Sequence, residues 1–164
     1  MTATPAPDRE AWETAALLLY EDEYVYVAVG PRAHSDWGHD LVAVLTRQTG
    51  DPRGWRTLDW DADDDSPFQP VTPSDACSRL TEISRRRAEG LLVALTDPWL
   101  NGKPTPEREA AARTLAARFG PDAAFHTNST GHRSWSPFTA CTLDVGVVAV
   151  SAEEIGAFWR LNPE

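Results

Sequence analysis

Three segments of the chain carry the pattern of helices. Within residues 8–20 the apolar side chains recur at the spacing of one helix face: Trp12, Ala15, Ala16 and Leu19. Asp8 can cap this helix. Capping threonines followed directly by proline, at 72–73 and 105–106, predict two further helices, from 73 to about 89 and from 106 to 119. Gly90 and Gly120 would end these two helices. Arg85–Arg87 would then lie in the last turns of the helix over 73–89, where the helix dipole favours cations.

Other segments carry the pattern of strands. In residues 24–29 tyrosine and alanine alternate with valine, which predicts a strand that is covered on both faces. Residues 41–47 and 55–60 flank a turn-forming TGDPRG segment and are expected to form a hairpin, preceded by a polar loop over 31–40. Further strands are expected over the apolar segments 91–96, 123–127 and 139–150, the last of them broken near Asp144.

The C-terminal segment fits two structures. Ser151 and Glu154 match a helical capping box, whereas Gly156 and the residues Ile155, Phe158 and Trp159 favour a strand. We prefer a hairpin in which 147–151 turns through 152–154 into 155–160. The sum is an α+β fold: a mixed, largely antiparallel sheet of six to eight strands with two or three packed helices. We expect residues 8–164 to be a single domain, and residues 1–7 a disordered lead-in.

Composition and motifs narrow the class of protein. Two cysteines, Cys77 and Cys141, are too few for a disulfide framework, and neither a signal peptide nor an apolar run of membrane-spanning length is present, so we expect a cytoplasmic protein. No GxGxxG or Walker-type loop, GxSxG elbow or CxxC motif occurs. We therefore predict no cofactor.

The acidic residues are concentrated in one half of the chain. Residues 1–75 contain 15 of the 25 acidic residues and 5 of the 15 basic ones, so this half carries the whole net charge of −10. Direct binding of nucleic acid through it is disfavoured because phosphate needs the opposite charge. A basic protein partner is favoured instead, although acidity can also serve solubility alone.

The densest acidic run is a candidate partner-binding segment. An EF-hand loop starting at Asp59 would need glycine at its sixth position and glutamate at its twelfth, where the chain has Asp64 and Pro70, so we predict no metal site there. A tryptophan ringed by carboxylates is typical of a hot spot for a basic partner, and a solvated turn is the alternative. With Trp37, the predicted partner-binding residues are Asp59, Trp60, Asp61, Asp63, Asp64 and Asp65.

Two clusters could serve an enzyme instead. The loop over 31–40 places His34, Asp36, His39 and Asp40 within seven residues, although their spacing matches no zinc pattern. The second cluster needs neighbouring strands to converge, and its members are His126, His132, Cys141 and Asp144, with Asn128 nearby. A polar turn and a buried core thiol are the alternative interpretations of the two clusters.

Two hypotheses follow. A small chain that is acidic in one half, rich in loop tryptophans and without a catalytic signature resembles the bacterial inhibitor or immunity proteins in physical profile, through no specific motif. The resemblance implies an acidic protein-binding module that blocks a basic toxic enzyme. The alternative is a small cytosolic hydrolase or metal-dependent enzyme that uses one of the two His/Asp or Cys/His/Asp clusters.

Overall fold

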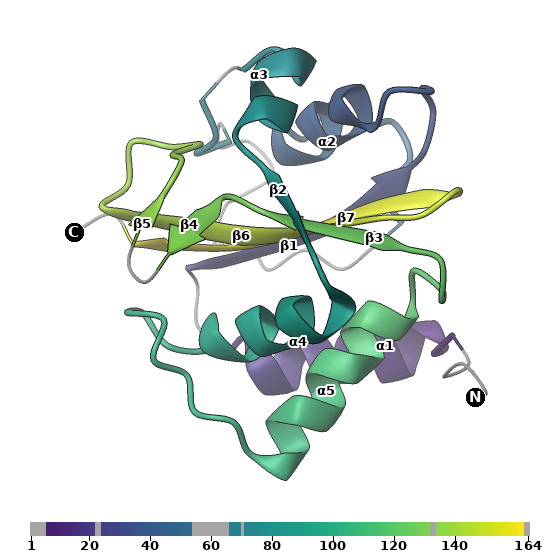
Figure 1. Ribbon diagram of the computed structural model, residues 1–164. Coiled ribbons are helices and arrows are strands. Elements are labelled where there is room, and N and C mark those ends of the chain that lie inside the picture. The colour runs from purple at the N-terminus through teal and green to yellow at the C-terminus, as the bar shows by residue number, and fades with distance from the viewer. Residues whose placement is uncertain (1–5, 22–23, 54–65, 70, 132–133, 163–164) are drawn as a thin grey trace.

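The computed structural model describes residues 6–21, 24–53, 66–69, 71–131 and 134–162. An antiparallel sheet in the order β1-β7-β6-β3-β2 divides the molecule into two layers of helices (Figure 1). Its strands are β1 Val25–Pro31, β2 Thr81–Ile83, β3 Ala124–Thr127, β6 Leu143–Val150 and β7 Glu154–Asn162. A separate pair is formed by β4 Ser129–Gly131 and β5 Ser134–Trp135.

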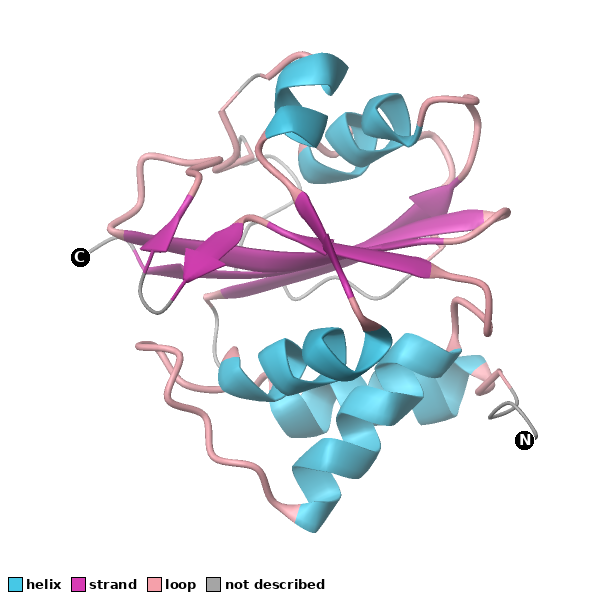
Figure 2. Ribbon diagram, viewed as in Figure 1, coloured by secondary structure: helices cyan, strands magenta, loops and turns pink. Residues whose placement is uncertain are grey.

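Helices cover both faces of the sheet (Figure 2). One face carries α1 Arg9–Leu19, α4 Arg85–Ala94 and α5 Pro106–Ala117, and the other carries α2 Trp37–Leu45 and α3 Pro73–Ser78. Successive residues of a strand point to opposite faces. In β6, accordingly, Val145 and Val147 enter the core under α1, α4 and α5, while Val148 enters the core under α2 and α3. The strand predicted over 24–29 is confirmed as β1, which is buried on both faces.

The predicted helix starts are confirmed at three places. The side chains of Asp8, Thr72 and Thr105 each accept a hydrogen bond from a backbone N–H of the first turn, and proline follows both threonines. Gly120 has a φ of 83° just beyond α5, in the left-handed region that glycine tolerates. The preferred C-terminal hairpin is also confirmed, since β6 and β7 pair from Val150 and Ile155 outward.

Two helices replace predicted strands. Residues 37–45 belong to α2, because Asp36 caps a helix whose positions Leu41, Val44 and Leu45 face the core. The predicted strand over 41–47 is therefore wrong, and the predicted polar loop over 31–40 is shortened to 32–36. Residues 91–94 belong to α4, so the predicted strand over 91–96 is wrong. Short apolar runs fit either element, and here the helical spacing continues through Gly90 instead of ending at it.

The predicted helix over 73–89 is interrupted. It ends as α3 at Ser78, the edge strand β2 follows, and Ser84 then caps α4. Arg85–Arg87 therefore lie in a first turn, where the dipole disfavours cations, and not in a last turn as predicted. Arg85 is accounted for by its partners, since its guanidinium donates to the carbonyls of Ala116 and Gly120 at the end of α5.

The α+β class and the largely antiparallel sheet are confirmed. The described residues contain seven strands, five of them in the main sheet, and five helices in place of the predicted two or three. None of those helices is long and apolar enough to cross a membrane. Residues 1–5 of the predicted lead-in and residues 55–60 of the predicted hairpin lie outside the described residues.

Candidate functional site

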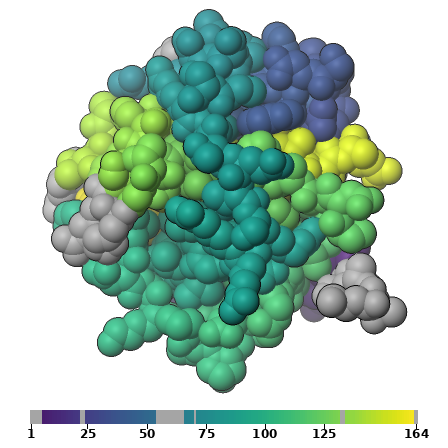
Figure 3. All heavy atoms as spheres, viewed as in Figure 1, coloured from purple at the N-terminus to yellow at the C-terminus, as the bar shows by residue number. Residues whose placement is uncertain are grey.

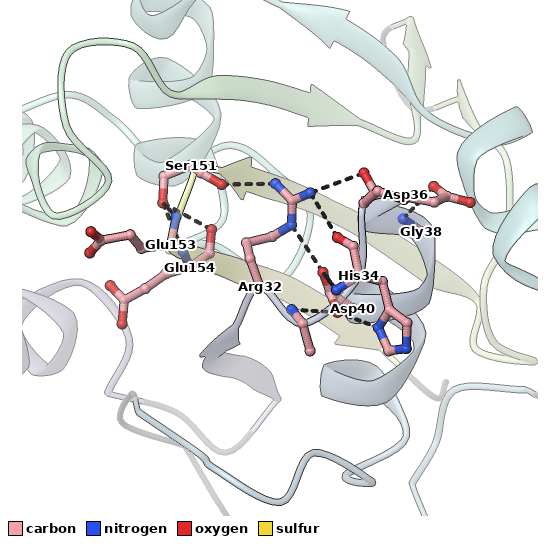
Figure 4. A network of polar contacts seen from close by, with 10 residues as sticks. Arg32, His34, Asp36, Gly38, Asp40, Ser151, Glu153 and Glu154 are labelled. Atoms are coloured by element: carbon pink, nitrogen blue, oxygen red, sulfur yellow. Dashed lines mark hydrogen bonds and ion pairs between the residues drawn. The ribbon is translucent and has the colours of Figure 1, made fainter.

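The first predicted cluster surrounds a buried carboxylate. Asp40, in the first turn of α2, is 3% exposed. Its oxygens accept hydrogen bonds from Arg32 Nε at 2.9 Å, from the backbone N of Ala33 at 3.1 Å and from that of His34 at 3.3 Å, and lie 2.9 Å from His34 Nδ1 (Figure 4). Asp36 takes a different role, because its carboxylate accepts from Gly38 N and caps α2.

Arg32, which the sequence analysis missed, joins this cluster to the turn between β6 and β7. Its Nη1 donates to the carbonyl of Ser151 at 2.9 Å, and its Nη2 donates to the carbonyls of His34 and Ser35 at 3.1 and 3.3 Å. Its backbone N donates to the carbonyl of Glu153 at 2.9 Å. These bonds fix the loop before α2 against a turn that is more than a hundred residues away in sequence.

The environment of Asp40 favours its charged form. Burial by itself would raise the pKa of Asp40, but the hydrogen bonds from His34, Ala33 and Arg32 outweigh burial and hold the pKa below its ordinary value. A buried carboxylate that is paired with an arginine avoids the cost of an isolated buried charge.

Two imidazoles stand at the surface above Asp40. The rings of His34 and His39 are stacked with centroids 5.0 Å apart and planes 27° from parallel, and both residues are exposed. When His34 carries its proton on Nδ1, it donates to Asp40 and presents Nε2 as an acceptor. This arrangement could orient a partner, or could take up a proton as a general base does.

Trp37 contacts a residue of the second predicted cluster. Its half-buried ring lies 4.5 Å from the ring of His126 on β3 and packs on the core under α2. Burial lowers the pKa of His126, and the charge of Glu82 acts in the opposite direction. The imidazole of His126 is thus covered by Trp37 and does not belong to the group around Asp40.

Within the second cluster, His126 and Asp144 are separated. His126 pairs with Val148, four residues along β6 from Asp144, which is a distance of about 13 Å. Asp144 is fully buried and accepts hydrogen bonds from Phe138 N at 2.6 Å, Thr139 N at 2.5 Å and Trp159 Nε1 at 2.6 Å. These contacts give Asp144 a structural role. Cys141 is half-buried, and His132 lies outside the described residues.

The acidic partner-binding segment also lies outside the described residues, from Asp59 through Trp60, Asp61, Asp63 and Asp64 to Asp65. The described residues before and after this segment, Arg53 and Ser66, bond to β1 and α2, the two elements joined by the loop that contains Arg32 and His34. Arg53 N donates to the carbonyl of Val29 on β1, and Ser66 Oγ donates to the carbonyl of Leu45 on α2.

In the described ranges, no group of three or more His, Cys, Asp or Glu residues is arranged to hold a metal ion. The chain matches no protein-family model, no curated protein and no solved structure.

Proposed function

We propose that the protein is a protein-binding module that blocks a basic partner, and that residues 32–40, which are the loop before α2 and the first turn of α2, form part of its contact surface. The observation that carries the proposal is the set of bonds around Arg32, which fixes this loop from both sides. The side chains of His34, Ser35, Asp36 and His39 are exposed on it. A loop that is already ordered loses little conformational entropy on binding, so its contacts translate into affinity.

Charge supports a basic partner. The loop belongs to the half of the chain that carries the whole net charge of −10. The acidic segment over 59–65 lies in the same half, and the described residues before and after it, Arg53 and Ser66, bond to Val29 of β1 and Leu45 of α2. Complementary charge accelerates encounter and gives it a strong dependence on salt. Trp60 within that segment is the proposed apolar anchor, together with the exposed part of the Trp37 ring.

The test is affinity capture of the tagged full-length chain from its native lysate at low and high salt, with four forms compared. The wild type should retain one basic partner at low salt. A control triple charge reversal on α1 and α5 should retain it as well, with the substitutions Glu10→Lys, Glu13→Lys and Glu107→Lys. The triple reversal Asp63→Lys, Asp64→Lys and Asp65→Lys should lose it. Arg32→Ala, which releases the loop, should weaken its capture.

Association and dissociation rates measured with the captured partner provide a second test. The Asp63–Asp65 reversal should slow association and flatten its salt dependence, because steering acts on the association rate. Arg32→Ala should mainly speed dissociation, because it disorders the contact surface without changing the acidic segment. Unchanged capture by all four forms, or capture of an acidic protein, contradicts the proposal.

A second function, acid–base catalysis, is favoured by one contact, the 2.9 Å distance between His34 Nδ1 and Asp40. A buried carboxylate that orients an exposed imidazole is one part of a hydrolytic site. If the chain is a hydrolase, His34→Gln and Asp40→Asn should abolish turnover of small ester and phosphate substrates, while His39→Gln retains it. Equal turnover by all three variants and the wild type would exclude this site.

A further inference from the structure

A hollow of about 440 Å³ lies on the opposite side of the sheet, between α4 and α5. Binding sites for small molecules typically have volumes of about 300–1,000 Å³. The two helices and the loop between them form the lower part of the surface in Figure 3. Val93 of α4 and Ala112 of α5 provide apolar wall, and Gly102 and Pro104 of the loop complete it.

Gly90 enlarges this hollow at a cost to α4. It lies inside the helix, where glycine is less favourable than alanine, and its Cβ would meet no atom within 4 Å. Packing therefore does not require glycine at this position. At Gly102, by contrast, a Cβ would lie 2.2 Å from the carbonyl oxygen of Val93, so packing alone accounts for that glycine. A glycine in the wall of a hollow lets a ligand approach the helix backbone closely.

Each helix contributes one cation and one anion to the rim. These are Arg86 and Glu89 on α4, and Glu109 and Arg113 on α5. None of the four side chains makes a hydrogen bond or an ion pair with another residue in the described part of the chain. All four therefore keep their hydrogen-bonding capacity for a ligand.

The mixture of charges restricts the chemistry of that ligand. Two glutamates repel a polyphosphate or a nucleic acid, and two arginines repel a polyamine. A carboxylate can bond to an arginine while an ammonium group of the same molecule bonds to a glutamate. The apolar wall between them suits a hydrocarbon side chain.

From the hollow, the unpaired charges and Gly90, we infer that the protein binds a small zwitterion with an apolar body, such as an apolar amino acid or a dipeptide, between α4 and α5. This site is independent of the protein-binding surface proposed above, because it lies on the other face of the sheet.

The test is a titration of the isotope-labelled full-length chain with the dipeptide leucyl-leucine, followed by proton–nitrogen correlation spectra. Saturable shifts are expected at the amides of Gly90, Gly102 and Arg113. The N-acetylated dipeptide lacks the ammonium group and the dipeptide amide lacks the carboxylate. Each should bind about tenfold more weakly, because a charged rim residue loses its partner.

Rim variants test which residue binds the carboxylate of the ligand and which binds its ammonium group. Arg113→Gln should remove the preference for the free carboxylate, and Glu89→Gln should remove the preference for the free ammonium group. Gly90→Leu, which fills the hollow, should abolish binding, whereas the controls Arg87→Gln and Ala110→Leu should leave it unchanged. The rim variants alter exposed or half-exposed side chains, so they remain informative if Gly90→Leu fails to fold.

Three results would overturn the proposal: no saturation at about 10 mM dipeptide, shifts confined to other residues, or equal binding of all three compounds.

Discussion

Replacement of Asp144 should test whether the buried carboxylate of β6 stabilises the fold. Its Oδ2 accepts from Phe138 N, Thr139 N and the Thr139 hydroxyl, and its Oδ1 accepts from Trp159 Nε1 at 2.6 Å. The carboxylate thus attaches the segment before β6 and a core tryptophan of β7 to one point. Asp144→Ala removes every one of these acceptors at once.

The magnitude follows from the donors that remain. The change leaves the two backbone N–H groups and the indole N–H buried without an acceptor, and each such group costs about 1–3 kcal/mol. Relief of the cost of burying a carboxylate offsets part of this sum. The three donors together cost about 3–9 kcal/mol, and after this offset we expect a loss of about 3–5 kcal/mol for Asp144→Ala. Since small domains have a stability of about 5–15 kcal/mol, this loss is a large fraction of the total.

Urea denaturation monitored by tryptophan fluorescence measures this loss, with an unchanged slope as the sign of a two-state transition. The control is Asp8→Ala, an exposed helix cap whose loss should cost only about 1 kcal/mol. A loss below that of the control would refute the structural role of Asp144 and return this residue to the catalytic hypothesis. In that case the variant should fold normally and lack activity.

Four further substitutions are expected to change stability. Gly90→Ala should stabilise the protein by about 0.5–1 kcal/mol in urea denaturation, because the new Cβ meets nothing, whereas Gly146→Ala should destabilise it, because a Cβ there would lie 2.1 Å from the Trp159 ring. Asp40→Asn should lower stability at neutral pH. Its difference from the wild type should shrink as the pH falls below about 4, since a depressed pKa contributes stability only while the carboxylate is charged. Arg85→Ala should cost about 1–2 kcal/mol in thermal unfolding, through lost bonds to the end of α5 and a lost cation–π contact 5.0 Å from the Phe125 centroid.

The parts of the fold that could be predicted from sequence are those with local signals. Asp8, Thr72 and Thr105 mark helix starts because a cap acts on residues within one turn of it. The apolar run of β6 is long enough to specify a strand, although the strand predicted over 139–150 begins only at Leu143 and continues through Asp144 without the predicted break. The run at 41–45 is not long enough, because five apolar residues fit either element, and packing on the sheet decides for the helix.

The same distinction applies to the candidate site. His34 and Asp40 could be associated from sequence because they are six residues apart. The role of Arg32 could not, since it depends on the carbonyl of Ser151 at the far end of the chain. At Gly90 the local pattern predicts a helix end, because glycine is common just after helices. Only the positions of α5 and the intervening loop show that a hollow lies over it.

A variant at either proposed site is a control for the activity of the other site. Residues 32–40 form the loop before α2 and its first turn, and the hollow lies between α4 and α5, so the five-stranded sheet separates the two sites. Substitutions at distant sites with no shared partners act additively. Gly90→Leu should therefore leave capture of the basic partner unchanged, and Arg32→Ala should leave dipeptide binding unchanged. If each variant impairs both activities while folding normally, the sheet couples the sites, and the dipeptide is then a regulator of partner binding.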